Sequence, residues 1–241
     1  MPRRALLGLL VCLLAAAPAA ARPTIVSLEF DDATADQAQA LPLLAAHGFA
    51  ATFFVNSAHV GRSGYLTWRR LHAIQRAGHE IAGHTLHHLR LTKLTPARVR
   101  HEVCADRSAL RAHGFAATDF AYPYGATDPA IERTVKACGY RSARRISGVQ
   151  CHGCPFAETV PPLDPFATRT PPAVLARDAP TILRRKVAGA QGHGGGWVQL
   201  VFHHVCSGCA TYAITRADLA GFLTWLERRR GVEVRRVSSM L

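Results

Sequence analysis

The sequence predicts an α/β fold, built either as an open parallel sheet or as a barrel. Short apolar runs rich in β-branched residues alternate along the chain with segments of helical period, which is typical of strands joined by crossover helices. Hydrophobic residues make up 49% and charged residues 19% of the sequence, a balance that disordered chains lack. The length of 241 residues suits one domain, and no repeat at a 20–50 residue period indicates a solenoid.

The predicted strands are short and mostly apolar. They cover residues 24–32, 51–56, 80–84, 120–124, 140–146 and 197–204, and residues 232–237 close the chain. The stretch 147–179 is rich in proline and glycine, so we expect long surface loops there that cover one end of the sheet. The glycine run at 192–196 predicts a turn rather than a phosphate-binding loop, because a strand follows it and no Lys-Ser/Thr pair does.

The predicted helices are placed by their end signals. Gly48 and Gly78 follow two of them, as expected of residues after a helix C-terminus. Thr67 can cap the second helix, and Pro96 suits the first turn of the third. The helices are expected at residues 35–47, 68–77, 96–113, 128–137, 180–190 and 215–229.

The N-terminus has the pattern of a secretory signal peptide over residues 1–21. Arg3 and Arg4 form a basic start, residues 5–17 are apolar, and residues 19–21 are the small residues that a signal peptidase requires. The apolar stretch is shorter than the roughly 20 residues of a membrane span. An uncleaved anchor, or a lipoprotein modified at Cys12, is an alternative. We therefore expect a secreted or cell-wall-associated domain at residues 22–241, with no integral membrane segment after processing.

The chain is strongly basic, with 29 Lys and Arg against 16 Asp and Glu, a formal net charge of +13. The arginines are scattered over separate segments, which indicates solvated helix faces or attraction to an anionic wall polymer. No basic motif interleaved with aromatic residues is present, so we expect no nucleic-acid partner.

Six cysteines remain once Cys12 leaves with the signal peptide. They are Cys104, Cys138, Cys151, Cys154, Cys206 and Cys209. An even number in an oxidising compartment favours disulfides. We expect a Cys104–Cys138 bridge, with the two C-x-x-C units bridged locally or to each other. A four-thiolate zinc site and a redox-active pair are the alternatives.

Candidate catalytic residues follow three of the predicted strands. Asp31 and Asp32 end the first strand, His84 and His88 follow the third, and His203 and His204 end the strand before the last helix. In α/β enzymes such strand ends carry the active site. Two imidazoles and one carboxylate can hold a zinc-like cation and leave positions open for water and substrate.

Adjacent carboxylates on a strand face opposite sides, so Asp31 and Asp32 can share one site only if the strand ends or bulges there. The other histidines are interpreted as surface or packing residues. His87 faces away from the His84–His88 pair if that segment has helical spacing.

Together these motifs resemble the polysaccharide deacetylases of carbohydrate esterase family 4. Glu29–Ala33 (EFDDA) is similar to the family motif T-F-D-D-G, and His84–His88 (HTLHH) matches H-[ST]-x-x-H. Ala121–Gly125 (AYPYG) is similar to R-x-P-Y-G, and Leu200–His203 (LVFH) to an apolar strand ending Leu-x-x-His.

The resemblance implies a distorted (β/α)7-type barrel with long loops over one end, and a role for each matching residue. Asp31 would be the general base and His203 the general acid. A divalent metal, most often Zn²⁺, with Co²⁺, Ni²⁺ or Mn²⁺ as alternatives, would be held by Asp32, His84 and His88. The remaining matches, Tyr124, Pro123 and Leu200, would bind substrate or, through the Tyr124 N–H, the oxyanion.

The sequence also departs from the family pattern. Ala33 replaces a glycine, and Ala121 stands where an arginine often orients the catalytic carboxylate. His204 replaces a frequent aspartate, and no Asp-x-x-Asp-Trp motif follows Ile146.

The function implied is secreted, metal-dependent hydrolysis of N- or O-acetyl groups on an acetylated polysaccharide or oligosaccharide, with a cell-wall polymer as a candidate partner. The alternatives are a non-catalytic glycan-binding relative and a metal-dependent amidase that acts on a small non-sugar amide.

Overall fold

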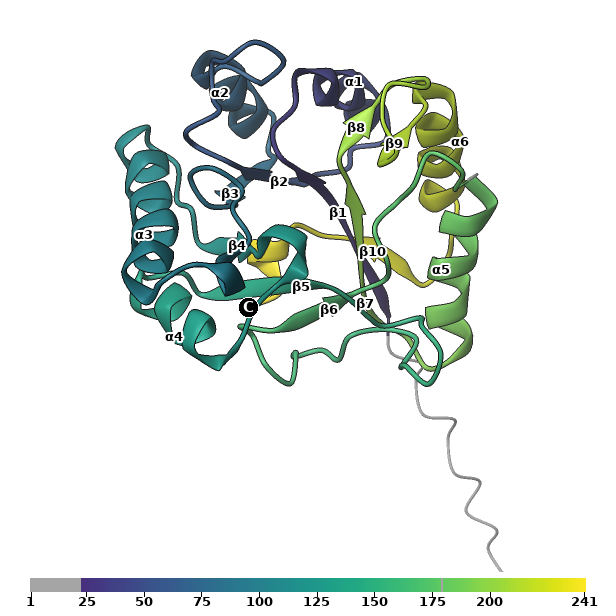
Figure 1. The fold of residues 1–241 in the computed structure, drawn as a ribbon. Coiled ribbons are helices and arrows are strands. Elements are labelled where there is room, and N and C mark those ends of the chain that lie inside the picture. The colour runs from purple at the N-terminus through teal and green to yellow at the C-terminus, as the bar shows by residue number, and fades with distance from the viewer. Residues whose placement is uncertain (1–22, 179) are drawn as a thin grey trace, which may run out of the picture.

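The computed structural model describes residues 23–178 and 180–241, and the predicted signal peptide lies outside them. Eight strands form one parallel sheet in the order β10-β1-β2-β3-β4-β5-β6, with β7 paired to the other edge of β1. Figure 1 shows the strands curled at the centre of the molecule with helices around them. The predicted α/β barrel-type fold is confirmed.

The strands of the sheet are short except for β1, β5 and β7. Their bounds are β1 Thr24–Asp31, β2 Thr52–Val55, β3 Glu80–Gly83, β4 Asp119–Ala121, β5 Ser142–Gly148, β6 Thr168–Thr170, β7 Gly196–Phe202 and β10 Val232–Val234. The side-chain amide of Gln199 on β7 donates to the backbone oxygen of Arg169 on β6 at 3.0 Å, so the two ends of the curled sheet meet there.

Over residues 23–178 and 180–241, six α-helices and four 3₁₀ segments accompany the sheet. The α-helices are α1 Leu41–Ala46, α2 Trp68–Arg76, α3 Pro96–Ala112, α4 Pro129–Ala137, α5 Pro180–Gly192 and α6 Arg216–Glu227. The 3₁₀ segments are η1 Ala35–Ala40, η2 Leu91–Lys93, η3 Pro123–Gly125 and η4 Val237–Ser239. None of the helices in the described ranges is long and apolar enough to cross a membrane.

Strand β1 separates two environments because its side chains alternate between faces. Val26, Leu28 and Phe30 belong to the large hydrophobic core. Ile25 belongs to a second apolar cluster, and the residues that share its face further along, Ser27, Glu29 and Asp31, are polar and buried. The inner face of β1 therefore becomes polar toward its C-terminal end, where it leads into the candidate site.

Several local predictions need correction. The predicted helix at 35–47 begins as the 3₁₀ segment η1 and becomes α-helical only at Leu41, because Pro42 has no N–H to donate and suits the first turn of a helix. The predicted strand at 120–124 ends at Ala121. Strand β6 lies within the stretch expected to be loop, and the small sheet of β8 (His204–Val205) and β9 (Ala213–Ile214) was not predicted.

All six cysteines of the described residues form disulfides. The bridges are Cys104–Cys138, Cys151–Cys154 and Cys206–Cys209, so both C-x-x-C units close locally. Cys104 lies on α3 and Cys138 caps the end of α4, so their bridge joins two neighbouring helices. The structure thus has disulfides rather than a four-thiolate zinc site.

Loop-closure entropy predicts unequal contributions from these bridges. Cys104–Cys138 spans 34 residues and Cys151–Cys154 only 3. Replacing both cysteines of the long bridge with serine should lower the free energy of unfolding by about 4 kcal/mol, and replacing those of the short bridge by about 2 kcal/mol. Urea denaturation of the two double variants measures both values. A larger loss for the short bridge would contradict this assignment.

Candidate metal and catalytic site

Six of the eight predicted site residues line a cavity of about 390 Å³ at the C-terminal ends of the strands: Asp31, Asp32, His84, His88, Tyr124 and His203. Its lining consists of Asp31, Asp32, His84, His88, Arg90, Tyr122, Tyr124, Ile146, Ala173, His203 and Tyr212. These residues come from segments that are far apart in the sequence. The strand order brings them together because parallel strands end at the same edge of a sheet.

Asp32, His84 and His88 are arranged as a possible set of metal ligands. Asp32 Oδ1 lies 3.6 Å from His84 Nε2 and 3.4 Å from His88 Nε2. Ligands about 2.0–2.2 Å from a tetrahedral zinc ion are roughly 3.3–3.6 Å apart, so these spacings fit such an ion. Three protein ligands leave a position open for water or substrate.

The two histidines present lone pairs rather than protons. His84 Nδ1 lies 2.7 Å from the Ala121 carbonyl oxygen and must donate its hydrogen to it, which leaves Nε2 as a lone pair facing Asp32. Burial lowers the pKa of His84 to about 3 and also lowers that of His88. Neutral imidazoles are the form that binds metal.

Asp32 lacks the partner that a buried carboxylate needs. Its Oδ1 atom is buried and makes no hydrogen bond in the described part of the chain. Burial and the neighbouring Asp31 raise the pKa of Asp32 to about 6. A divalent cation between Asp32 and the two imidazoles would satisfy this oxygen, so the residues present fit a metal ion.

Left-handed backbone conformations make the clustering of these groups possible. Positive φ angles occur at Asp32 (74°), Ala33 (55°), Thr85 (69°), His88 (56°) and Tyr124 (60°). Because β1 ends at Asp31 and the chain turns at Asp32, both carboxylates reach the cavity, as their shared role requires. Ala33 adopts a conformation that favours glycine, the residue found there in the motif that it resembles.

The HTLHH segment is irregular rather than helical, so His84 and His88 approach each other through the turn at Thr85, not through helical spacing. His87 points to α3, where its Nδ1 lies 3.0 Å from Glu102 Oε1. The prediction that His87 takes no part in the metal site agrees with this placement.

Arg144 contributes the cation that the sequence lacks at Ala121, and our sequence analysis missed it. The two residues are neighbours in the β4–β5 register, and the Arg144 guanidinium contacts Asp31 Oδ1 and Glu29 Oε2. Arg144 is only 1% exposed. The predicted strand at 140–146 includes Arg144, but no local signal in the sequence shows that its side chain is buried while that of Arg145 is exposed.

The buried Arg144 distinguishes the two carboxyl groups that it contacts. Burial raises the pKa of Glu29 to about 8, against the opposing effect of Arg144. Burial would also raise the pKa of Asp31, but Arg144, His84 and His203 outweigh it and the pKa is lowered. Asp31 is therefore the carboxylate that stays ionised, and its Oδ2 atom faces His84 and His203.

His203 lies directly after β7, with its Nε2 atom 4.0 Å from Asp31 Oδ2. Its Nδ1 atom is buried without a hydrogen-bond partner among the described residues, and its ring lies 5.1 Å from that of Tyr212. The next residue, His204, turns away and bonds Asp36 at 2.7 Å. His203 and Asp31 are therefore neighbours in the lining of the cavity.

Tyr124 alone of the three expected substrate contacts lines the cavity. Its ring is 55% exposed, packs 4.7 Å from that of His88 and carries the guanidinium of Arg90 at 4.4 Å. Pro123 and Leu200 are buried, and neither belongs to the cavity lining. Leu200 packs in the hydrophobic core, where it supports the strand that leads to His203.

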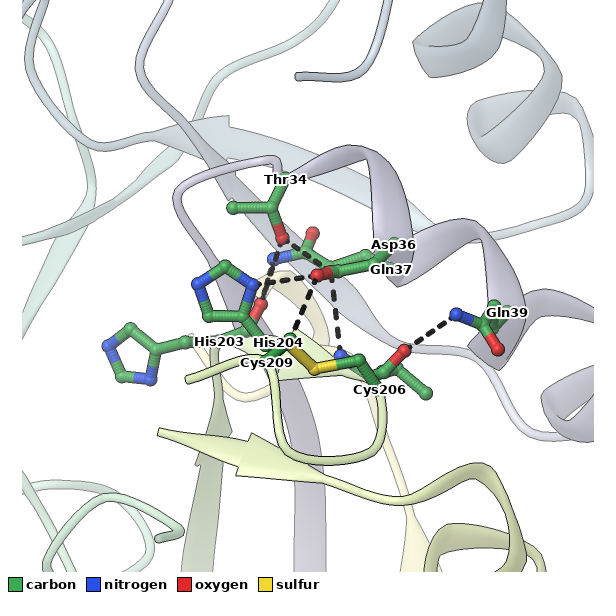
Figure 2. Close-up of a disulfide and its surroundings, with 9 residues drawn as sticks. Thr34, Asp36, Gln37, Gln39, His203, His204, Cys206 and Cys209 are labelled. Atoms are coloured by element: carbon green, nitrogen blue, oxygen red, sulfur yellow. Dashed lines mark hydrogen bonds and ion pairs between the residues drawn. A yellow bond between two sulfur atoms is a disulfide. The ribbon is translucent and has the colours of Figure 1, made fainter. Parts of the chain in front are cut away.

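A second group of possible ligands, Asp36, Cys206 and Cys209, lies beside β8. Figure 2 shows that both sulfur atoms are bonded to each other next to Asp36. The Asp36 carboxylate is also occupied by His204 and Thr34. This group therefore has no thiolates to offer while the disulfide is intact.

Comparison with known proteins agrees with the geometry. One relative is YxkH of Bacillus subtilis (strain 168), which is described as a polysaccharide deacetylase. It is 31% identical to this chain over 119 residues. The match covers 48% of this chain and 42% of that protein, so this chain matches less than half the length of its relative.

Solved structures share the fold. One from Mycobacterium smegmatis, described as a polysaccharide deacetylase, has a TM-score of 0.69 at 19% identity, covering 93% of this chain and 91% of that one. The peptidoglycan deacetylase PdaC from Bacillus subtilis has a TM-score of 0.57 at 15% identity, covering 90% of each chain. The family model described as "Polysaccharide deacetylase" matches residues 19–143, more than half of the sequence. The chain therefore belongs to the polysaccharide deacetylase family.

Proposed function

We propose that the protein is an exported, metal-dependent hydrolase that removes N- or O-linked acetyl groups from a polysaccharide or oligosaccharide. The observation that carries the proposal is one cavity that holds a three-residue metal-ligand set, Asp32, His84 and His88, beside an ionised carboxylate and a histidine. Metal-assisted hydrolysis uses this combination, whereas sugar binding alone does not require it.

Asp31 is suited to be the general base. Arg144 contacts Oδ1, which leaves Oδ2 directed toward the cavity and free to accept a proton from the attacking water. A divalent ion at Asp32, His84 and His88 would lower the pKa of that water and polarise the acetyl carbonyl.

His203 is suited to be the general acid. Its ring lines the cavity beside Asp31, and a protonated imidazole can donate a proton to the departing amine or alcohol. An amine leaves poorly unless it is protonated, so this step matters most for N-acetyl groups. The backbone N–H of Tyr124, at the rim of the same cavity, is our candidate for stabilising the oxyanion.

Arg144 weakens the non-catalytic alternative. That alternative is favoured by the missing arginine at Ala121 and by the missing Asp-x-x-Asp-Trp motif, but Arg144, which pairs with Ala121 in the sheet, places a buried arginine beside the carboxylate of Asp31. We propose a cell-wall glycan as substrate: the chain is basic, and its three disulfides suit an oxidising compartment. The similarly folded PdaC, a peptidoglycan deacetylase, supports the same choice.

Acetate release from a panel of acetylated chitin oligomers, xylan and peptidoglycan fragments tests the proposal. The purified protein should release acetate from at least one of them, and rigorous chelation should reduce the rate to background. Adding back Zn²⁺ should restore activity, because the three ligand residues remain in place. Full activity in a sample shown by elemental analysis to be metal-free would contradict the proposal.

Two substitutions should separate catalysis from metal binding. Asp31→Asn removes the base, so kcat should fall by about 10²–10⁴-fold while bound metal stays near the wild-type level. His84→Ala removes a ligand, so metal and activity should be lost together. His87→Ala, a change in the same motif outside the ligand set, serves as the control and should retain both. Metal loss in His87→Ala but not in His84→Ala would refute the ligand assignment.

The pH dependence of activity should report the contact between Arg144 and Asp31. Arg144 lowers the pKa of Asp31, so Arg144→Met should raise it, and the acidic limb of the kcat/KM profile should move to higher pH. Arg145→Met, at the exposed neighbouring position on β5, should leave the limb in place. Equal shifts in the two variants, or a shift of the limb to lower pH, would be inconsistent with this role.

A further inference from the structure

The buried side chain of Gln37, on η1, links the two chain segments that carry Asp31 and His203. Its Nε2 atom donates to the backbone oxygen of Asp31 and, at 2.7 Å, to that of His203. Both partners are carbonyl oxygens, so only the nitrogen of the amide can face them, and its two hydrogens supply one bond each. Gln37 is fully buried, and Figure 2 shows it beside the segment that carries His203.

These two carbonyl groups lie where the β1–β7 ladder stops. The last paired residues of the two strands are Phe30 and Phe202. Asp31 directly follows Phe30, and His203 directly follows Phe202. Backbone pairing thus holds the strands together up to the site but not within it. The Gln37 amide links the two segments at Asp31 and His203, where no further backbone pair forms.

Neighbouring side chains on the same segment secure the His203 side separately. The Thr34 hydroxyl lies 3.1 Å from the His203 carbonyl oxygen, and Gln39 donates to the Val205 carbonyl oxygen at 2.8 Å. Asp36 bonds His204, as Figure 2 also shows. These contacts dock the chain after β7 onto η1, whereas Gln37 also reaches the end of β1.

We propose that Gln37 is a positioning residue that fixes the separation between the general base and the general acid. The proposal rests on the proposed function, in which Asp31 accepts a proton from the attacking water and His203 donates one to the leaving group. Their reacting atoms, Asp31 Oδ2 and His203 Nε2, are 4.0 Å apart. A displacement of about 1 Å in such a pair can reduce a rate by about 10²-fold.

Gln37→Met tests the proposal because methionine has a similar length and no donor. We expect kcat on the acetylated glycan to fall by about 10- to 100-fold, with KM within about two-fold of wild type and metal content unchanged. Gln39→Met, two residues away on the same segment and exposed, is the matched control. It removes only the contact to Val205, which lies beyond His203 and does not reach β1, so this variant should stay within about two-fold of wild type. Gln37→Asn keeps the amide but is too short to reach both carbonyls, so it should show the same loss if the methionine variant does not fold.

A crystal structure of the Gln37 variant gives a readout that does not depend on activity. We expect the Asp31–His203 separation to change in the Gln37 variant and not in Gln39→Met. Wild-type protein that releases no acetate would overturn the proposed function, while the structural comparison would still decide this inference. An unchanged separation, wild-type kcat in both Gln37 variants, or an equal loss in Gln39→Met would overturn it.

Discussion

The parallel pairing of β1 with β2 on one edge and β7 on the other determines where the chemistry of this protein can occur. Asp31 is in register with Phe54 on β2, and Phe30 with Phe202 on β7. Because these strands end at the same level, Asp31 and His203, which are more than 170 positions apart in the sequence, line the same cavity. The stacked rings of Phe30, Phe53 and Phe202 pack beneath this level and hold the three strands together.

Burial of charge is the second constraint. The inner face of the sheet holds Glu29, Asp31 and Arg144, and a lone buried charge there would cost several kcal/mol. Arg144 offsets this cost for Asp31. No arginine or lysine of the described residues forms an ion pair with Asp32, and the Oδ1 atom of Asp32 has no hydrogen bond. The same burial keeps His84 and His88 neutral. Asp32, His84 and His88 thus present one carboxylate and two neutral imidazoles to the position that a metal ion would occupy.

Much of this arrangement could be predicted from the sequence, because local signals specify it. The helix cap at Thr67, the proline that begins the helix at Pro96 and the apolar strand that leads to Asp31 are local patterns, and the structure contains each of them. Arg144 and Gln37 could not be assigned in this way. Their roles depend on partners 113 and 166 positions away, which only the sheet register brings into contact. The turn within HTLHH could not be predicted either, because no residue such as glycine marks the positive φ at Thr85.

The most direct test of the central claim is the position of a bound metal ion. Anomalous scattering from a zinc-loaded crystal should give one peak about 2.0–2.2 Å from Asp32 Oδ1, His84 Nε2 and His88 Nε2. A strong peak beside Asp36, Cys206 and Cys209, with none between the two histidines, would contradict the account.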